Sequence, residues 1–389
     1  MSKRYLKAKY IHIGNGTVLK DAGLVVNQNG IIEEIGEKLS IPKEKVEHFE
    51  GILCPGFINT HCHLELSHLK GKVQEHTQLN GFIQELQSIR MADKNTIEAA
   101  FYAADKEMQN EGIVAVGDIC NDPFTFKCKK ESPIFYHSFI ELFAYDPAKA
   151  QSFFDKGWNI KKQANRIKIS ASIVPHAPYS VSNMLFKMIT AIEGQEPISI
   201  HNQETASENE LFQKGGGKMA EMLLQFGNKK ENLHVSGRNS LPTYISNLPS
   251  DKPLLLVHNT FTTKEDVEFA EKAHSNLFWC FCPNANLYIE NKLPNIPMFI
   301  KSGVRITLGT DSLASNYQLS ILEEMKSIQK AYPSIPTSTL IQWGTKSGAE
   351  FLGLKDFGEL KVNTNPGIVF INAIENGKFS EKSKARRIV

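Results

Sequence analysis

The sequence lacks any long hydrophobic run. No stretch of about 18 consecutive apolar residues occurs, so we do not expect a membrane-spanning helix. Residues Met1–Tyr5 lead directly into a strand pattern, without the apolar segment of a signal peptide. We therefore expect a cytoplasmic protein that has no membrane partner.

Cysteines are few and scattered. The six cysteines, at positions 54, 62, 120, 128, 280 and 282, lie in or beside apolar runs. They lack the density and spacing of a disulfide framework, which is consistent with a reducing cytoplasm. Cys280 and Cys282 could form a soft metal pair, but the sequence has no second pair of this kind, and this favours packed thiols.

Neither sign of charge is in excess. The 44 Lys and Arg residues against 42 Asp and Glu residues give a formal net charge of +2. The sequence also has no basic stripe, so we exclude nucleic acid and anionic membranes as partners and expect a small-molecule substrate. The 41% of apolar residues in 389 positions can bury a core of the size found in a large α/β barrel.

From residue 54 onward, short β-like runs alternate with helical patterns. The β-like runs are 54–61, 113–120, 133–142, 167–175, 197–201, 253–258, 277–282 and 304–310. The main helical patterns are 81–110, 148–163, 183–192, 208–226, 264–274, 318–332 and 337–352. Eight such units across about 300 residues predict an α/β fold, a (β/α)8 TIM barrel over residues 54–353.

The two ends of the chain follow a different pattern. Residues 5–53 contain short strand-like runs separated by Gly-Asn and Asn-Gly turn signals, which predict a small antiparallel β unit. The segment 357–374 is again β-like. We predict that residues 1–53 and 354–389 together form a composite β-sandwich beside the barrel.

Two histidines lie at the end of the first predicted barrel strand. Because side chains at positions i and i+2 of a strand point the same way, His61 and His63 are aimed at one spot, whereas Cys62 faces the other side. Two convergent imidazoles are half of a metal site. Taken alone, the pair fits equally well two unrelated histidines, one of them packed in a core.

Other polar residues follow the later strands. His176 comes after the fourth strand, His201 after the fifth, His258 after the sixth and Asp311 after the eighth. Active sites of (β/α)8 barrels lie at the carboxyl ends of the strands. The distribution therefore favours a shared metal site over unrelated histidines.

Two carboxylates extend this set. Glu204 lies three residues after His201 and can reach the same cavity, although it also fits the acidic first turn of a helix. Asp311 leaves an apolar strand, where an unpaired carboxylate is costly unless it meets a cation, and the cap of the next helix is better assigned to Ser315 or Asn316. Three imidazoles and one carboxylate leave a position for water on a Zn2+-like ion, which indicates hydrolysis.

Several of these residues stand in longer motifs. The motifs are Pro55-Gly56-Phe57-Ile58-Asn59-Thr60-His61-Cys62-His63, His176-Ala177-Pro178-Tyr179-Ser180, His201-Asn202-Gln203-Glu204-Thr205, His258, Cys282-Pro283-Asn284-Ala285-Asn286 and Gly309-Thr310-Asp311-Ser312-Leu313-Ala314-Ser315-Asn316. In this order and over nearly the whole chain, they resemble the amidohydrolase superfamily, specifically its cytosine-deaminase-like and chlorohydrolase-like branch. The flanking β unit is similar to the composite β-sandwich of that branch.

The resemblance implies a role for each site residue. The ligands of one divalent metal ion would be His61, His63, His201 and Asp311, with Zn2+ as the first choice and Fe2+, Mn2+ or Ni2+ as alternatives. Glu204 would protonate the ring nitrogen beside the attacked carbon, and His258 would orient and polarise the water. Asp311 would take the proton of the water and pass it to the departing ammonia.

The resemblance also implies a substrate class. His176 would contact the ribose or the ring, and Glu65 lines the pocket or serves as a structural carboxylate at the rim. The motif His63-Leu64-Glu65-Leu66-Ser67 is similar to that of aminodeoxyfutalosine deaminases. The implied reaction is therefore hydrolytic deamination of an adenosine-like nucleoside.

The residue motifs leave other functions open: deamination of S-adenosylhomocysteine, methylthioadenosine or guanine, chlorohydrolysis, or a non-catalytic binding barrel. By analogy with relatives, we expect a homodimer.

Overall fold

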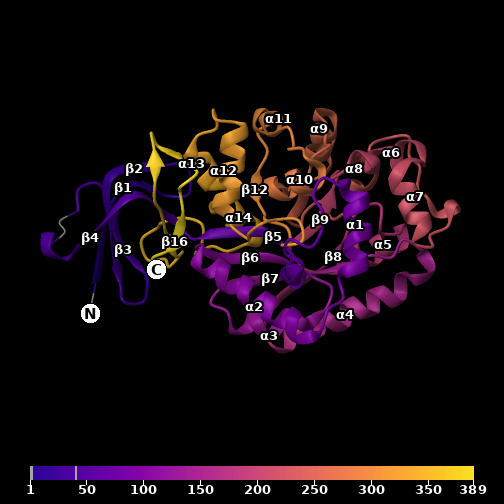
Figure 1. Cartoon of the computed structure of the whole chain (residues 1–389), viewed down its shortest axis with the longest axis horizontal. Coiled ribbons are helices and arrows are strands. Elements are labelled where there is room, and N and C mark those ends of the chain that lie inside the picture. The colour runs from indigo at the N-terminus through magenta and orange to yellow at the C-terminus, as the bar shows by residue number, and fades with distance from the viewer. Residues whose placement is uncertain (1–2, 40–41) are drawn as a thin grey trace.

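The computed structural model describes residues 3–39 and 42–389. The barrel occupies most of the molecule, and a β sheet made from both chain ends lies at one side of it (Figure 1). In Figure 1 the indigo strands near the N-terminus lie beside the yellow strands near the C-terminus. Among the described residues, every helix is too short or too polar to cross a membrane.

Eight parallel strands form the barrel. They are β5 (Phe57–Cys62), β6 (Ile113–Cys120), β7 (Phe135–Leu142), β8 (Ser170–Pro175), β9 (Ile198–Asn202), β10 (Leu254–His258), β11 (Leu277–Phe281) and β12 (Ile306–Leu308). Their order is β5-β6-β7-β8 in one four-stranded sheet and β9-β10-β11-β12 in the other. Strands β6 and β9 to β11 are buried over their whole length, as expected for a parallel sheet covered by helices.

Backbone contacts join the two half-sheets at both edges. At one edge, the amide of His201 donates a hydrogen bond of 2.9 Å to the carbonyl of His176. At the other, the amides of Thr310 and Asp311 donate to the carbonyl of His61 at 3.0 and 3.1 Å, and Cys62 pairs with Asp311 in a parallel bridge. The fold is thus the (β/α)8 barrel that the sequence predicts, and both edges carry residues of the predicted site.

Helices connect and cover the strands. They are α1 (Gln78–Ile89), α2 (Lys94–Asn110), α3 (Phe126–Glu131), α4 (Ala150–Arg166), α5 (Asn183–Thr190), α6 (Ala206–Lys214), α7 (Gly217–Gln225), α8 (Ser240–Tyr244), α9 (Lys264–Ala273), α10 (Pro283–Glu290), α11 (Ile296–Lys301), α12 (Ile321–Ala331), α13 (Thr337–Trp343) and α14 (Lys346–Leu352). Local capping sets several of the boundaries. The Thr263 hydroxyl and the Asp266 carboxylate, for example, form a capping box at the start of α9.

Three helices predicted as continuous are in fact pairs, so these predictions were wrong. The pattern 81–110 comprises α1 and α2, 208–226 comprises α6 and α7, and 337–352 comprises α13 and α14. Asp93 starts α2 afresh because its carboxylate accepts a hydrogen bond from the amide of Thr96. Helix α6 ends at Gly215, whose φ of 70° lies in the left-handed region that glycine tolerates. Hydrophobic periodicity continues across such breaks and does not reveal them.

The sheet beside the barrel contains segments from both chain ends. Its strands are β1 (Lys3–His12), β2 (Val18–Asn27), β3 (Ile32–Gly36), β4 (Val46–Pro55), β13 (Ile368–Ile371) and β16 (Ala385–Arg387), in the order β16-β13-β4-β1-β2-β3. A two-stranded hairpin, β14 (Ile374–Glu375) and β15 (Lys378–Phe379), accompanies it. The N-terminal strands are not wholly antiparallel as predicted, because β1 and β4 pair in parallel.

The junction between this sheet and the barrel lies at Gly56. The predicted strand 54–61 is divided here, because Pro55 ends β4 and Phe57 begins β5. A side chain at Gly56 would clash with Val114 and would place its Cβ 2.7 Å from the carbonyl oxygen of Pro366. The absence of a side chain thus allows the chain to pass closely between the two units. Strand β4 extends two residues beyond the boundary predicted at residue 53.

Candidate active site

The first three predicted site residues lie together at the barrel mouth. The Nε2 atoms of His61 and His63 are 3.2 Å apart. The Oδ1 atom of Asp311 lies 3.2 Å from Nε2 of His63 and 3.6 Å from Nε2 of His61. Segments separated by some 250 positions in the chain therefore bring three ligand-type atoms to one point.

His201 and His258 join the same group through His61. One ring nitrogen from each of these three histidines lies within 4.8 Å of the other two, and the same limit holds for His61, His63 and Asp311. The Nδ1 atom of His201 hydrogen-bonds to the backbone carbonyl of His176 at 2.9 Å. This bond assigns the ring proton to Nδ1 and leaves the Nε2 lone pair for a ligand.

Strained backbone holds two of these side chains in place. His258 and Asp311 have φ values of 74° and 56°, in the left-handed region that non-glycine residues rarely adopt. Asn259, whose φ is 60°, stabilises the turn after β10, because its side-chain amide donates to the carbonyls of Leu256 and Cys280 at 2.9 and 3.1 Å. Strained backbone of this kind is common at functional sites, where many surrounding contacts fix the direction of a side chain.

The chemistry of the donor set fits a divalent metal ion. Burial lowers the pKa of His63 to about 3 and that of His258 to about 4, so both rings are neutral and offer lone pairs. Burial by itself would raise the pKa of Asp311, but its close contact with His61 and the neighbouring imidazoles hold it well below its usual range. Imidazole nitrogens and a carboxylate that converge in a buried place are a ligand set that suits a divalent cation.

The remaining predicted catalytic residue lies at the edge of this cluster. The Oε2 atom of Glu204 is 3.6 Å from Nε2 of His258, and both side chains are buried. Burial raises the pKa of Glu204 well above its ordinary value, and the charges of Asp311 and Glu290 raise it further. The raised pKa favours the protonated form of Glu204, which can act as an acid.

A cavity of about 470 Å³ opens beside the cluster. Its wall includes His63 and His176, and the Nδ1 atom of His176 is fixed by a hydrogen bond of 2.6 Å with the Ser180 hydroxyl. A second cavity of about 440 Å³ adjoins the first, because six residues line both. These residues are Leu66, Arg90, Asn121, Glu141, Phe143 and Phe153. The combined volume of the two cavities is larger than a compact nucleoside would fill.

Glu65 is not brought into the cluster. It lines only the second cavity, where its Oε2 accepts a hydrogen bond of 3.0 Å from the backbone amide of Asn121. Burial raises the pKa of Glu65 to about 7. This contact supports the structural alternative, and a substrate contact of Glu65 stays a prediction.

The sequence analysis missed two polar residues of the site. Glu141 lies near the end of β7 and its Oε1 is 3.4 Å from Nδ1 of His201, while its Oε2 accepts a hydrogen bond of 3.2 Å from the side chain of Asn121. Asn121 directly follows β6. The search for polar residues at strand ends covered only His, Asp and Glu residues that follow a strand. The same search would have found both residues if it had included amide side chains and the last positions within each strand.

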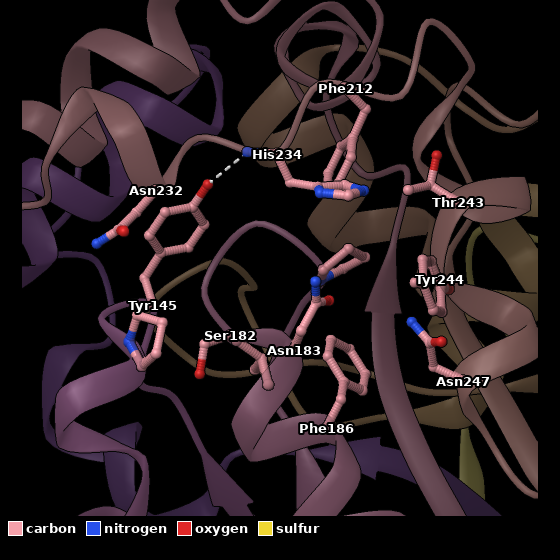
Figure 2. Close-up of a pocket in the computed structure, with 13 residues that line it drawn as sticks. Tyr145, Ser182, Asn183, Phe186, Phe212, Asn232, His234, Thr243, Tyr244 and Asn247 are labelled. Atoms are coloured by element: carbon pink, nitrogen blue, oxygen red, sulfur yellow. Dashed lines mark hydrogen bonds between the residues drawn. The ribbon is translucent and has the colours of Figure 1, made fainter.

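A smaller cavity of about 110 Å³ lies apart from the cluster (Figure 2). None of the predicted site residues lines it. Tyr145 lines both this cavity and the one beside His63, and its hydroxyl accepts a hydrogen bond of 3.0 Å from the amide of His234, drawn as the dashed line in Figure 2. The bond ties the segment after α7 to the rim of the larger cavity.

The cysteine pair is part of the core. Cys280 and Cys282 are fully buried free thiols whose sulfur atoms are 4.0 Å apart. The Thr60 hydroxyl donates a hydrogen bond to the sulfur of Cys280. Neither thiol belongs to a candidate metal group among the described residues. The packing agrees with the interpretation as buried thiols.

Comparison with known proteins identifies this arrangement. The model of the amidohydrolase family matches residues 52–388, which is most of the chain. The chain belongs to the amidohydrolase family. It is therefore a hydrolytic enzyme that acts on carbon–nitrogen bonds, and the superfamily predicted from the motifs is confirmed.

Similar amidohydrolases include several named deaminases. The chain is 28% identical to an adenosine deaminase of Helicobacter pylori over 89% of this chain and 86% of that one. It is 27% identical to an aminodeoxyfutalosine deaminase of Nitratiruptor sp., covering 86% of this chain and 82% of the relative. A crystal structure of H. pylori aminofutalosine deaminase in complex with methylthio-coformycin has a TM-score of 0.83 and 25% identity, covering 99% of this chain and 100% of the other.

Proposed function

We propose that this amidohydrolase is a metal-dependent deaminase that replaces the exocyclic amine of an adenosine-like nucleoside by an oxo group. Water supplies the oxygen: a carbon–oxygen bond forms at the amine-bearing ring carbon, the carbon–nitrogen bond breaks and ammonia leaves. The observation that carries the proposal is the position of His61, whose ring lies in one group with His63 and Asp311 and in a second with His201 and His258. Glu204 lies beside His258 in the second group. The named deaminases among its relatives support the choice of substrate class.

The family uses a divalent metal, and we propose that this site holds one ion. His61, His63, His201 and Asp311 would hold it, and Zn2+ is our first choice because imidazole and carboxylate are typical zinc ligands. A bound ion of this kind supplies Lewis acidity that lowers the pKa of water from about 15.7 towards about 7.

The residues of the chain move the protons. Glu204, whose protonated form is favoured by its raised pKa, donates to the ring nitrogen beside the attacked carbon and so makes that carbon more electrophilic. Neutral His258, whose Nε2 lies 3.6 Å from Glu204, orients the water on its side of the cluster. The ionised Asp311 accepts the proton of the water and passes it to the departing ammonia.

The cellular setting forms part of the proposal. The six cysteines are buried and free, which supports a reducing compartment, and we propose the cytoplasm. A homodimer stays a prediction from analogy. Family membership and the complete set of site residues give no support to the alternative of a non-catalytic barrel.

An ammonia-release assay over a substrate panel tests the proposal. Metal-loaded protein would be incubated with adenosine, 5′-deoxyadenosine, methylthioadenosine, S-adenosylhomocysteine, aminodeoxyfutalosine, guanine and a chlorotriazine. We expect ammonia from at least one adenine nucleoside, with a kcat/KM above about 10⁴ M⁻¹s⁻¹ for the physiological substrate. Activity confined to guanine, chloride release from the triazine, or no turnover of any adenine nucleoside would contradict the proposal.

A further inference from the structure

The ring of His258 has one nitrogen without a partner. Its Nε2 lies 3.6 Å from Glu204, on the side where the reaction takes place. Its Nδ1 is buried and forms no hydrogen bond among the described residues. In a neutral imidazole one nitrogen carries a proton and the other a lone pair. The group that binds Nδ1 therefore decides which of the two Nε2 offers to the reaction.

Asn286 carries a complementary unpaired atom. Its side chain is fully buried, and its Oδ1 also lacks a hydrogen bond within residues 3–39 and 42–389. Its side-chain nitrogen donates a hydrogen bond to the hydroxyl of Thr260, two residues after His258. This bond fixes the direction of the amide, because the nitrogen faces Thr260 and the oxygen is left for another donor.

The two unpaired atoms belong to side chains that are in contact. Burial lowers the pKa of His258 to about 4, and the contact with the side chain of Asn286 acts in the opposite direction. A group that accepts a hydrogen bond from the ring acts in this direction, because it stabilises the protonated form. A buried donor and a buried acceptor are each costly when left unpaired, and a bond between them removes both costs.

The motif that contains Asn286 holds it in a fixed place. The motif Cys282-Pro283-Asn284-Ala285-Asn286 starts α10, where the amide of Asn286 donates to the carbonyl of Cys282 at 2.9 Å. The backbone and side-chain amides of Asn284 both donate to the carboxylate of Glu324 on α12, at 2.9 and 3.0 Å. The start of α10 is thus anchored to its neighbour, and Asn286 is directed at the turn after β10.

We propose that Asn286 is a positioning residue whose Oδ1 accepts the Nδ1 proton of His258. With the proton held there, Nε2 keeps its lone pair on the side of Glu204 and can accept a hydrogen bond from the attacking water. The opposite tautomer would present a proton instead, and this proton would occupy a lone pair of the water that the attack needs. The inference rests on the proposed function, in which His258 orients the water.

The tautomer of His258 can be measured directly by NMR. Nitrogen-15 spectra would be recorded on zinc-loaded protein labelled in histidine, because a protonated ring nitrogen and one with a lone pair have different chemical shifts. The signals of His258 are those that disappear in His258→Gln. We expect the proton on Nδ1 in the wild type. A proton on Nε2 would overturn the inference, whatever any variant shows.

Three variants test the part of Asn286. Asn286→Leu removes the acceptor with little change in size, whereas Asn286→Asp keeps an acceptor oxygen at the same place. Asn276→Leu is the matched control, because Asn276 is a half-buried asparagine directly before β11 that accepts a hydrogen bond of 3.0 Å from Arg305. The ring spectrum, the melting temperature, and kcat and KM for the best substrate of the panel are measured for each variant.

We expect Asn286→Leu to lower kcat by about 10- to 100-fold, with KM changed by less than about threefold, and to lose the fixed Nδ1 proton of His258. Asn286→Asp should keep that proton and be more active than Asn286→Leu. Asn276→Leu should leave kcat and the spectrum unchanged, even where the melting temperature falls. A lower melting temperature in Asn286→Leu, with kcat and the spectrum unchanged, would show that Asn286 is only structural.

The spectrum does not depend on turnover, which separates this inference from the proposed function. An Nδ1 proton that depends on Asn286, in protein that releases no ammonia from any adenine nucleoside, would overturn deamination and leave the inference intact. Ammonia release by protein in which His258 carries its proton on Nε2 would overturn the inference alone.

Discussion

Replacing Glu204 by glutamine is expected to lower kcat by about 10²- to 10⁴-fold while the metal content of the protein stays unchanged. Glutamine keeps the size of the side chain and its place beside His258, but it cannot donate a carboxylic proton to the substrate ring. Because Glu204 is not one of the four proposed ligands, the ion should stay bound. Steady-state ammonia release and metal analysis of the same preparation measure the two effects.

Glu210→Gln is the matched control for this prediction. Glu210 is an exposed residue of the following helix, α6, so its replacement should leave kcat within about twofold of the wild type. Retained turnover in Glu204→Gln would refute the proton-donor role. Loss of both turnover and metal would instead show that Glu204 is a ligand.

Asp311→Asn should lower both metal affinity and turnover, whereas Glu204→Gln should lower turnover alone. The substitution removes the only carboxylate among the proposed ligands, so we expect metal affinity to fall by more than the 10- to 100-fold that is typical of outer-shell changes. Turnover should fall with it, because the same carboxylate accepts the proton of the water. The melting temperature should no longer rise when metal is added, since a ligand stabilises only the protein that binds it.

Ser315→Ala is the control that separates ligand from support. The Ser315 hydroxyl donates a hydrogen bond of 2.6 Å to Oδ2 of Asp311, so alanine removes the support but keeps the carboxylate. We expect a loss of metal affinity of about 10- to 100-fold, smaller than for Asp311→Asn. Metal titrations followed by calorimetry would measure both variants. Unaltered affinity in Asp311→Asn would exclude Asp311 as a ligand.

The barrel and the cluster of histidines with Asp311 were predictable because their signals are local. The i and i+2 positions of His61 and His63 on one strand fix their common direction, whatever the rest of the chain does. The strand-end positions of His201, His258 and Asp311 then follow from the common polarity of parallel strands. Once eight strands are recognised, their ends must lie at one mouth of the barrel.

What the sequence could not show depends on contacts between distant segments. Ser315 was a candidate cap of the next helix. Its hydroxyl instead donates a hydrogen bond to Asp311, and Ser320 caps α12. Arg90 looked like part of one long helix, whereas the break between α1 and α2 places it at the cavity wall. Gly56 separates two strands because Val114 and Pro366 crowd it from elsewhere in the chain. Short sequence patterns cannot predict these contacts, because the contacting residues are far apart in the chain.

Anomalous diffraction from crystals of the wild-type protein, collected at the absorption edge of the metal found by elemental analysis, is the most direct test. We predict a single anomalous peak per chain, about 2.0–2.2 Å from ring nitrogens of His61, His63 and His201 and from a carboxylate oxygen of Asp311. A peak bound by other residues, a second ion held by Glu141, or no peak in active protein would contradict the central claim that these four side chains hold one catalytic ion.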